Sequence, residues 1–312
     1  MRTLFIFIDG VGLGGDSPAN PFSNIKTPGI NKILDGADLT DSSADYSGKM
    51  STLLALDATL GTPGLPQSAT GQATIFTGEN APALINKHLN GFPDQRLRQL
   101  LAAKGMFRAF KRKGYRVSFA NAYRPLFFNK LRYGLPGVRY SCSTLVTFYG
   151  GVSFYSVEDI KSGNALFMDI TNDILIKMGC SVPLFSPDQG ARQLYKISAG
   201  FDFCLFEYFL TDLAGHLGEP KESERVISIL DQFIGTLADL INPAEEFLII
   251  SSDHGNIEDL TTRKHTLNKV PALLIGNKAL RAELKNEMND LTDILPALNR
   301  MLEWEGGSHA GH

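Results

Sequence analysis

Residues of the kinds that bind metal ions follow directly on short apolar runs in this chain of 312 residues. The run at residues 247–250 leads to Asp253 and His254, and a turn glycine, Gly255, comes next. A buried strand with this ending presents a carboxylate and an imidazole at the edge of a sheet, where both could bind a metal ion. A strand end followed by a polar turn would leave the same pattern, so this pair alone does not decide the matter.

Four further ligand-type residues stand in comparable places. His265 lies twelve residues after Asp253 and just before another apolar run. Asp9 follows the first apolar run of the chain, and Asp212 and His216 follow a later one. Three of the six histidines in the chain therefore occupy positions that suit metal ligands.

These residues can be assembled into two clusters. One cluster holds Asp9, Ser68, Asp253 and His254, and the other holds Asp212, His216 and His265. Carboxylate and imidazole ligands together suit Mn²⁺, Zn²⁺ or Fe²⁺ better than Ca²⁺, which prefers oxygen ligands alone. Two metal ions about 4 Å apart can hold the attacking and leaving oxygens of a phosphoryl transfer. A metal ion also lowers the pKa of a serine hydroxyl and so activates it as a nucleophile.

Ser68 is the nucleophile candidate in this pattern. It follows a loop rich in glycine and proline, and the residues after it predict a helix over 68–77 with Ser68 as its N-cap. A serine at this place either caps the helix or attacks a phosphate held at the positive end of the helix. Sequence position alone leaves both roles open.

Other motif-based interpretations fit less well. The glycines from Gly10 to Gly15 match G-x-G-x-x-G, but the proline-containing loop DSPANPFSN follows where a dinucleotide site needs a helix. Ser68 does not stand in the G-x-S-x-G turn of a serine hydrolase, and the chain has no H-E-x-x-H motif. No cysteine or serine stands in the C/S-x-P-x-R context of a sulfatase.

The elements that must position these residues alternate between strands and helices. The pattern predicts strands at 4–8, 51–58, 115–120, 201–210 and 247–250, and helices at 28–34, 68–77, 93–113 with a break at Gly105, 166–178, 187–197, 223–240 and 291–301. This order predicts an α/β fold with a doubly wound, largely parallel sheet and helices on both faces. Asp9, Arg124, Asp212 and Asp253 each come at or just after a predicted strand end, where such sheets bind ligands.

Composition narrows the class of protein. The chain is 43% hydrophobic and 20% charged with a net charge of −3, which is typical of a soluble protein and does not favour nucleic acid or an anionic membrane as a partner. Its three dispersed cysteines fit a reducing compartment. No run approaches the roughly 20 apolar residues of a membrane span. We therefore expect a soluble, cytoplasmic protein, and the oligomeric state stays open.

The segments FIDGVGLG, PQSATGQ, DLAGH, DHGN and KHTLNKVP together resemble the alkaline phosphatase superfamily. They are most similar to its metalloenzyme branch, which contains cofactor-independent phosphoglycerate mutase and phosphopentomutase. The resemblance implies an alkaline-phosphatase-like fold and two divalent ions, with Mn²⁺ or Zn²⁺ favoured over Mg²⁺ or Fe²⁺. It places Asp9, Ser68, Asp253 and His254 at one ion and Asp212, His216 and His265 at the other. It makes Ser68 the residue that carries the phosphoryl group, with Thr70 as the second candidate.

Two departures from that branch shape the expected function. Gly71 and Gln72 stand where the branch has Gly-His, and only 144 residues separate Ser68 from Asp212, too few for the large cap domain of the mutases. We therefore expect one domain over 1–312 with a small lid within 124–185 and a flexible tail at 305–312.

The expected activity is hydrolysis of a small phosphate ester through a phosphoserine. A phosphomutase, acting on phosphoglycerate or a sugar phosphate, and a metal-binding relative without catalysis are the alternatives. The expected substrate contacts are Arg124, Gln72 and Lys264. Arg263 could also meet a phosphate, and the roles of His88 and Glu258 stay open.

Overall fold

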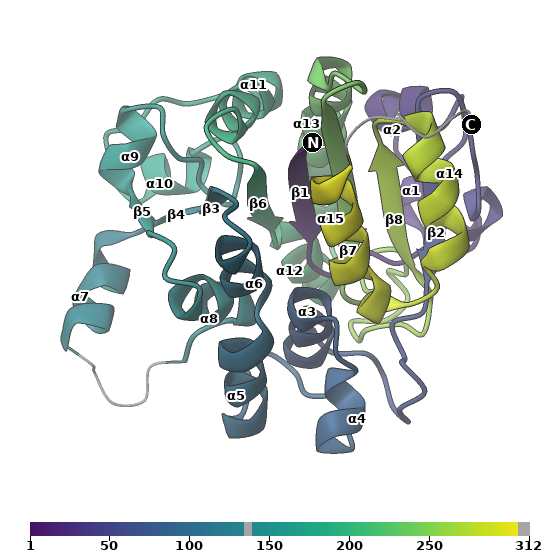
Figure 1. The fold of residues 1–312 in the computed structure, drawn as a ribbon. Helices are drawn as coiled ribbons and strands as arrows, with labels where there is room; N and C mark the ends of the chain where they lie inside the picture. Colours follow the sequence, from purple (N-terminus) through teal and green to yellow (C-terminus); the bar gives the residue numbers. More distant parts are fainter. Residues whose placement is uncertain (134–138, 305–312) are drawn as a thin grey trace, which may run out of the picture.

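The computed structural model describes residues 1–133 and 139–304 and has a six-stranded sheet at its centre (Figure 1). The strands lie in the order β2, β8, β7, β1, β6, β3. Their bounds are Arg2–Ile8 for β1, Ser51–Leu56 for β2, Val117–Phe119 for β3, Phe203–Tyr208 for β6, Glu246–Ser252 for β7 and Val270–Ile275 for β8. Only β8 runs against the others, because it pairs antiparallel with both β2 and β7. The predicted, largely parallel sheet is confirmed.

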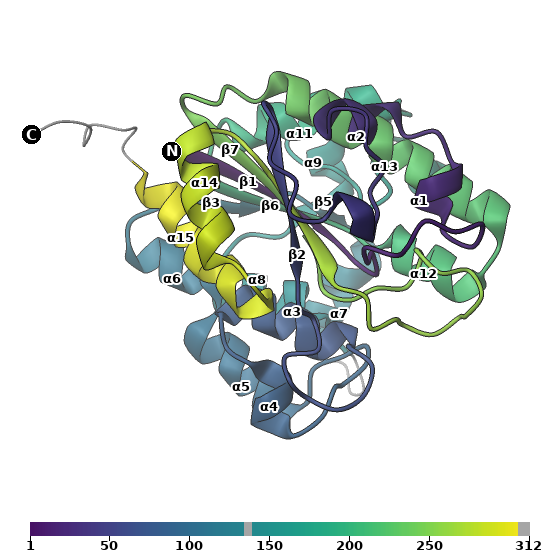
Figure 2. The same cartoon turned by 90° about the vertical axis from the view of Figure 1, so that its right-hand side faces the viewer.

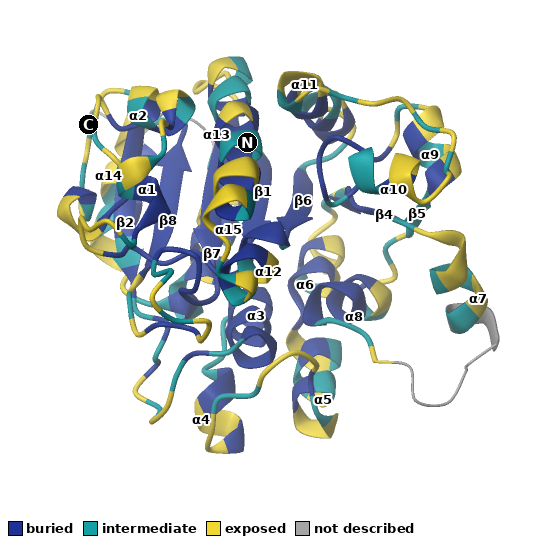
Figure 3. Cartoon of the chain, turned by 180° about the vertical axis from the view of Figure 1, so that it is seen from behind, coloured by how far each residue is buried: buried dark blue, intermediate teal, exposed yellow. Residues whose placement is uncertain are grey.

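Helices cover both faces of this sheet (Figure 2). The helices are α1 Pro21–Asn24, α2 Pro28–Ile33, α3 Ser68–Thr77, α4 Ala81–Ile85, α5 Gln95–Lys104, α6 Met106–Arg112, α7 Pro125–Tyr133, α8 Cys142–Tyr149, α9 Val157–Lys161, α10 Asp173–Lys177, α11 Pro187–Ser198, α12 Leu210–Leu217, α13 Pro220–Leu240, α14 Lys278–Glu287 and α15 Ile294–Glu303. Phe5 and Phe7 of β1 pack among residues of α3, α5, α6, α8, α14 and α15. Leu4, Ile6 and Ile8 pack among residues of α2, α11 and α13. Both faces of β1 are therefore buried, as Figure 3 shows for the sheet as a whole, and this explains its uninterrupted apolar sequence.

The register of the central strands brings the ligand-type residues to one edge. Ile8, the last residue of β1, is paired with Tyr208 of β6 and with Ser252 of β7, each also the last of its strand. The chain therefore leaves all three strands side by side, at Asp9, at the start of α12, and at Asp253.

Residues 120–133 and 151–186 form a satellite beside the β3 edge of the sheet, while α8 between them packs in the main core (Figure 1). The satellite holds the short parallel strands β4 (Ala122–Tyr123) and β5 (Tyr155–Ser156). It also has a small apolar cluster of its own, which includes Val157, Ile160 and Phe167. The expected lid range, 124–185, falls largely within this satellite.

The helix predicted over 166–178 is wrong for its first half. Leu166 is extended: its N–H donates to the Ala120 carbonyl at 3.0 Å, and its own carbonyl accepts the Ala122 N–H at 2.8 Å. Ile170 and Asn172 then take positive φ angles of 68° and 65°, which end any helix started before them. Only α10, from Asp173 to Lys177, is helical.

Two further expectations concern membrane-spanning helices and the C-terminal tail. Within residues 1–133 and 139–304, no helix combines the length and the apolar composition that crossing a membrane requires. The tail that the sequence predicts to be flexible, 305–312, lies outside the described residues.

Candidate metal centre

Asp9, Asp253 and His254 form an inner group at the ends of β1 and β7. The Nε2 atom of His254 lies 3.2 Å from Asp9 Oδ1 and 3.6 Å from Asp253 Oδ2. The side chains of Asp253 and His254 are both completely buried. Two carboxylates and an imidazole are thus held together in a buried position, with only Asp9 slightly exposed.

Asp212, His216 and His265 form an outer group next to it. Asp212 and His216 lie one turn apart on α12, and His265 lies on the loop that leads into β8. The Nε2 atom of His216 is 3.4 Å from Asp212 Oδ2, and that of His265 is 3.5 Å from Asp212 Oδ1. The two Nε2 atoms are 3.2 Å apart. Three ligand atoms therefore converge on one point.

The two groups touch through Asp212. Ligand atoms of Asp9, Asp212 and His254 all lie within 4.8 Å of one another, and so do those of Asp212, His216 and His265. The rings of His254 and His265 also stack, with centroids 3.7 Å apart. The sequence places Asp212 in the outer group alone, whereas the structure puts its carboxylate between the two groups.

Backbone carbonyls set the orientation of the outer histidines. Nδ1 of His216 lies 2.8 Å from the Arg263 carbonyl oxygen, and Nδ1 of His265 lies 2.8 Å from that of Pro66. A carbonyl can only accept, so each Nδ1 carries the proton and each Nε2 keeps a free lone pair. This is the tautomer that a metal-binding histidine needs. Arg263 thus contributes its backbone to the centre, while its side chain is exposed.

Burial and neighbouring charges shift the pKa values of four of these residues. Burial raises the pKa of Asp9 and raises that of Asp253 well above its usual value. Burial alone would lower the pKa of His254, but the neighbouring Asp253 and Asp9 carboxylates outweigh it and raise the value to about 10. Burial, with the nearby His254, lowers the pKa of His265 to about 4.

These observations fit divalent cations. Asp9 Oδ1 and Asp253 Oδ2 are buried, and among the described residues neither accepts a well-directed hydrogen bond. A buried carboxylate oxygen without a donor is costly unless a cation meets it. The donor set of oxygens and imidazole nitrogens suits transition-metal ions such as Mn²⁺ and Zn²⁺.

Ser68 faces the inner group. Its Oγ lies 3.0 Å from His254 Nε2, and the residue is 7% exposed. The predicted N-cap role is wrong, because Gln67 is the N-cap and Ser68 is the first helical residue of α3. Thr70, the second nucleophile candidate, does not face the inner group in this way. Its hydroxyl donates to the Gln67 carbonyl at 3.1 Å and accepts the Leu89 N–H at 3.3 Å.

Close packing explains the glycines of the motifs. A Cβ on Gly10, where φ is +74°, would lie 2.8 Å from Asp212. A Cβ on Gly71 would lie 2.7 Å from the Asp253 carbonyl oxygen. The glycine pattern that resembles a dinucleotide fingerprint therefore lets the first loop approach the ligand groups, and no helix follows it directly.

Glu258, undecided from the sequence, joins the loops around the centre. Its carboxylate accepts the N–H of Gly12 at 2.9 Å, the N–H of Asn256 at 2.7 Å, the Thr266 hydroxyl and the Asn268 side chain at 3.1 Å. The residue is 2% exposed. It thus connects the loop after β1, the loop after β7 and the loop before β8.

Two amides hold the ligand carboxylates. Asn256 Nδ2 donates to Asp212 Oδ1 at 2.7 Å, and Gln72 Nε2 donates to Asp9 Oδ2 at 3.1 Å. The sequence reading gave Asn256 no role, although it stands inside the DHGN motif. It made Gln72 a substrate contact, whereas the structure places this buried side chain on Asp9.

Comparison with known proteins connects this geometry to a family. The family model described as Metalloenzyme superfamily matches residues 144–304, just over half of the chain. The chain belongs to the Metalloenzyme superfamily. A 2,3-bisphosphoglycerate-independent phosphoglycerate mutase of Cereibacter sphaeroides is 26% identical over 125 residues, which are 38% of this chain and 24% of that protein. The matched part thus spans about a quarter of the length of such curated relatives.

Solved structures show the fold of this metalloenzyme in other proteins. The PH0037 protein of Pyrococcus horikoshii gives a TM-score of 0.57 at 14% identity, covering 99% of this chain and 98% of that one. A cold-active alkaline phosphatase of a Shewanella species gives 0.53 at 10% identity, covering 97% and 100%. The predicted resemblance to the alkaline phosphatase superfamily and the predicted fold class are confirmed.

The remaining predicted contacts of this metalloenzyme lie on its surface. Lys264 is exposed next to His265. Arg124 is exposed and its guanidinium lies 3.4 Å from the Met178 sulfur. It follows β4 of the satellite, so the expectation that it ends a strand of the main sheet is wrong. His88 donates from Nε2 to the Thr62 carbonyl at 3.1 Å.

Glu207 on β6 is a buried carboxylate that the sequence reading missed. Burial raises its pKa to about 8, and the Ser143 hydroxyl donates to Oε2 at 2.8 Å. Asn121 exchanges two hydrogen bonds of 2.8 Å with its backbone. A glutamate inside the apolar run FCLFEY was the available signal, because a charge in a strand buried on both faces needs a reason.

Proposed function

We propose that this metalloenzyme transfers phosphoryl groups with two divalent ions and with Ser68 as the nucleophile. The observation that carries the proposal is the place of the Ser68 hydroxyl, 3.0 Å from His254 in a buried cluster of carboxylates. Serine oxygen, imidazoles and carboxylates are here arranged around a point where phosphate charge can be neutralised. We further propose Mn²⁺ or Zn²⁺ as the ions and a small phosphate ester as the substrate.

The residues divide the work as follows. Asp9, Asp253 and His254 would hold one ion and Asp212, His216 and His265 the other, with Ser68 at the inner one. The ions would supply positive charge for the phosphoryl oxygens and lower the pKa of the serine hydroxyl.

The Ser68 oxygen bonds to phosphorus as the bond to the leaving oxygen breaks, and the departing alcohol ends with the proton that Ser68 gives up. Ser68 starts α3, so the N-terminal end of this helix favours the phosphate that remains on it.

Hydrolysis is the outcome we propose for the phosphoserine. A mutase must keep water from its phosphoserine while the substrate turns. The segment available as a lid consists of the satellite with its short helices, and we propose that it shields the centre only in part. Lys264, exposed beside His265, is the cation that we propose for substrate phosphate.

A phosphomutase is the second candidate, and a specific observation favours it. The curated relative named above is a phosphoglycerate mutase, and its match covers 38% of this chain. In a mutase, a second hydroxyl of the bound product would take the phosphoryl group from Ser68 in place of water.

Product analysis separates the two outcomes. The metal-loaded enzyme is incubated with 3-phosphoglycerate and with pentose 1-phosphates, and inorganic phosphate and isomerised esters are both measured over time. We expect phosphate to form faster. If the isomerised ester forms faster than inorganic phosphate, the enzyme is a mutase and not a hydrolase. If no phosphate ester is turned over with Mn²⁺, Zn²⁺, Mg²⁺ or Fe²⁺, phosphoryl transfer itself is refuted.

A further inference from the structure

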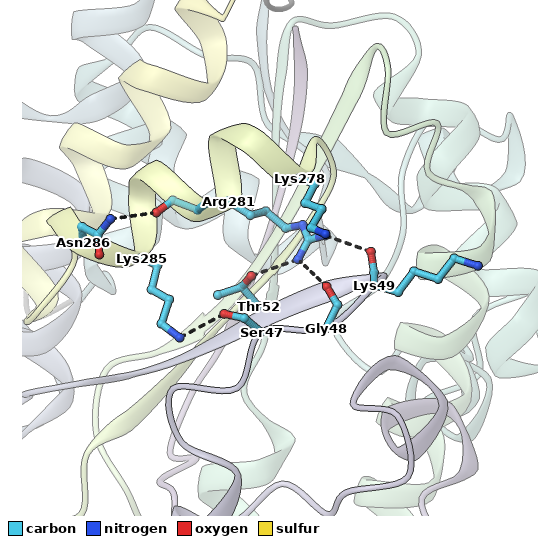
Figure 4. Close-up of a pocket in the computed structure, with 9 residues that line it drawn as sticks. Ser47, Gly48, Lys49, Thr52, Lys278, Arg281, Lys285 and Asn286 are labelled. Carbon is cyan, nitrogen blue, oxygen red and sulfur yellow. Dashed lines mark hydrogen bonds between the residues drawn. The ribbon is translucent and has the colours of Figure 1, made fainter.

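A second concentration of charge lies at the opposite end of the sheet from the metal centre. Because β8 runs antiparallel, its last residue, Ile275, is paired with Leu248 near the start of β7 and with Ser51 at the start of β2. The inner group, by contrast, follows the last residue of β7. The segment before β2 and the helix α14 meet at this far end (Figure 4).

A cavity of about 580 Å³ lies between these two segments. It is lined by Ser47, Gly48, Lys49, Thr52, Lys278, Arg281, Ala282, Lys285 and Asn286. Four of these residues are cationic, and the lining contains no carboxylate. The volume is within the range of roughly 300–1,000 Å³ that small-molecule sites occupy.

Arg281 is the centre of this cavity. It is 2% exposed, and its guanidinium donates to the carbonyls of Gly48, Lys49 and Gly276 at 3.4, 3.0 and 3.2 Å. It also donates to the Thr52 hydroxyl at 2.9 Å. These neutral acceptors take four of its five N–H groups, and they leave its positive charge without a partner.

No carboxylate in the described part of the chain forms an ion pair with Arg281. Asp35 is close to Gly48, but it accepts the Tyr46 hydroxyl and does not line the cavity. Burial lowers the pKa of Arg281, yet a guanidinium keeps its proton in proteins. A buried positive charge without a counter-charge is costly, and an anion in the cavity would remove that cost.

Two lysines add charge beside it. Lys285 donates to the Asp45 carbonyl at 2.6 Å and to the Ser47 hydroxyl at 3.0 Å, which leaves one of its three N–H groups. The Lys278 ammonium has no hydrogen-bond partner among the residues described, and Lys278 lines the same cavity as Arg281 (Figure 4). Lys49 extends away from the guanidinium in the same view.

We propose that this cavity binds a small anion that carries at least two phosphate groups. One phosphate brings about two negative charges, whereas Lys278, Arg281 and Lys285 together bring three positive ones. A guanidinium and ammonium groups are the side chains that suit phosphate oxygens. This cavity is separate from the metal centre, and the proposal does not depend on the phosphoryl transfer proposed for the metal centre.

Calorimetric titration of the metal-loaded, full-length protein with cyclic trimetaphosphate tests this site. We expect saturable binding that is at least about tenfold weaker in the Lys278→Gln/Lys285→Gln variant. A matched variant, Lys26→Gln/Lys196→Gln, changes two exposed lysines elsewhere and should bind like the wild type. Thermal unfolding of both variants verifies that the fold is intact.

A second measurement locates the anion. Trimetaphosphate should protect Lys278 and Lys285 from acetylation, as read by peptide mass spectrometry, and should protect them equally in His265→Ala. Absence of binding to the wild type, or binding that His265→Ala abolishes and Lys278→Gln/Lys285→Gln leaves unchanged, would overturn the proposal. The latter result would assign the anion to the metal centre.

Discussion

The inner and outer groups of the metal centre use the same residue types in different settings. The inner group, Asp9, Asp253 and His254, lies directly at the ends of neighbouring parallel strands and is buried. The outer group lies on α12 and a loop, and the side chain of His216 is 38% exposed. Burial raises the pKa values of both carboxylates of the inner group, while backbone carbonyls orient the two histidines of the outer group.

The difference indicates a division of roles between the two groups. A rigid, dry site holds a cation strongly and keeps the nearby Ser68 in place. A partly exposed site can exchange its ion and admit a substrate. The predictions below test that division, from the largest expected effect to the smallest.

The largest effect should come from the residue that faces the inner group. Ser68→Ala should lower turnover of a phosphate ester by at least about a thousandfold, because among the described residues no other hydroxyl contacts the His254 imidazole. Thr70→Val serves as the control and should retain most activity if its fold is intact. Phosphate found on Thr70 by peptide mapping would move the nucleophile there.

Removing one outer ligand should separate the two ions. His265→Ala should weaken one ion by about a hundredfold and leave the other bound, because the inner group keeps all of its own ligands. Elemental analysis after chelation, reloading and dialysis should show close to one ion per chain, against two in the wild type. Loss of both ions together would mean that the groups act as one site through Asp212.

The two supporting amides offer a matched pair. Gln72→Ala should weaken the ion at the inner group by about tenfold, because Asp9 loses the donor that orients it. Asn256→Ala should do the same to the outer ion through Asp212. In metal titrations, the Gln72→Ala variant should therefore lose the inner ion first and the Asn256→Ala variant the outer ion first. If Gln72→Ala changes only the Michaelis constant, Gln72 contacts the substrate and does not support the metal ligand.

The smallest effect concerns pH in the chelated protein. His254 has its pKa raised from 6.5 to about 10, so its contribution to stability is complete below 6.5 and is lost as pH rises toward 10. His265 has its pKa lowered from 6.5 to about 4, so its contribution is present above 6.5 and is lost as pH falls toward 4. The pKa values of Asp9 and Asp253 are also raised, so the stability that these two groups contribute is likewise lost as pH rises.

Among the ligand residues, therefore, only the inner group should change stability above pH 6.5, and Glu207, with its pKa raised to about 8, adds to the fall in the same direction. We expect His254 to account for a fall of about 1 kcal/mol in the free energy of unfolding between about pH 6.5 and 7.5, measured by urea titration. His254→Gln should flatten this fall, and His265→Gln should leave it in place. An equal effect of both substitutions would contradict the difference between the groups.

Much of the fold and the centre could be predicted from local patterns. Apolar runs on β1, β6 and β7 predicted buried parallel strands, because a strand covered on both faces cannot alternate with polar residues. Ligand-type residues after such runs had to meet, since parallel strands end at one edge. Such runs predicted the candidate ligands, whereas Ser68 was predicted from a helix start after a Gly/Pro-rich loop and from the resemblance to the alkaline phosphatase superfamily.

The tertiary structure decided what depends on contacts between distant segments. No local pattern shows that Gln72 reaches Asp9, that Asp212 stands between both groups, or that Glu258 joins three loops. The helix expected around Leu166 fails for the same reason, because pairing with the β3 segment outweighs a weak local preference. No local pattern singled out Arg281, and only the packing of α14 against the start of β2 buries it without a counter-charge.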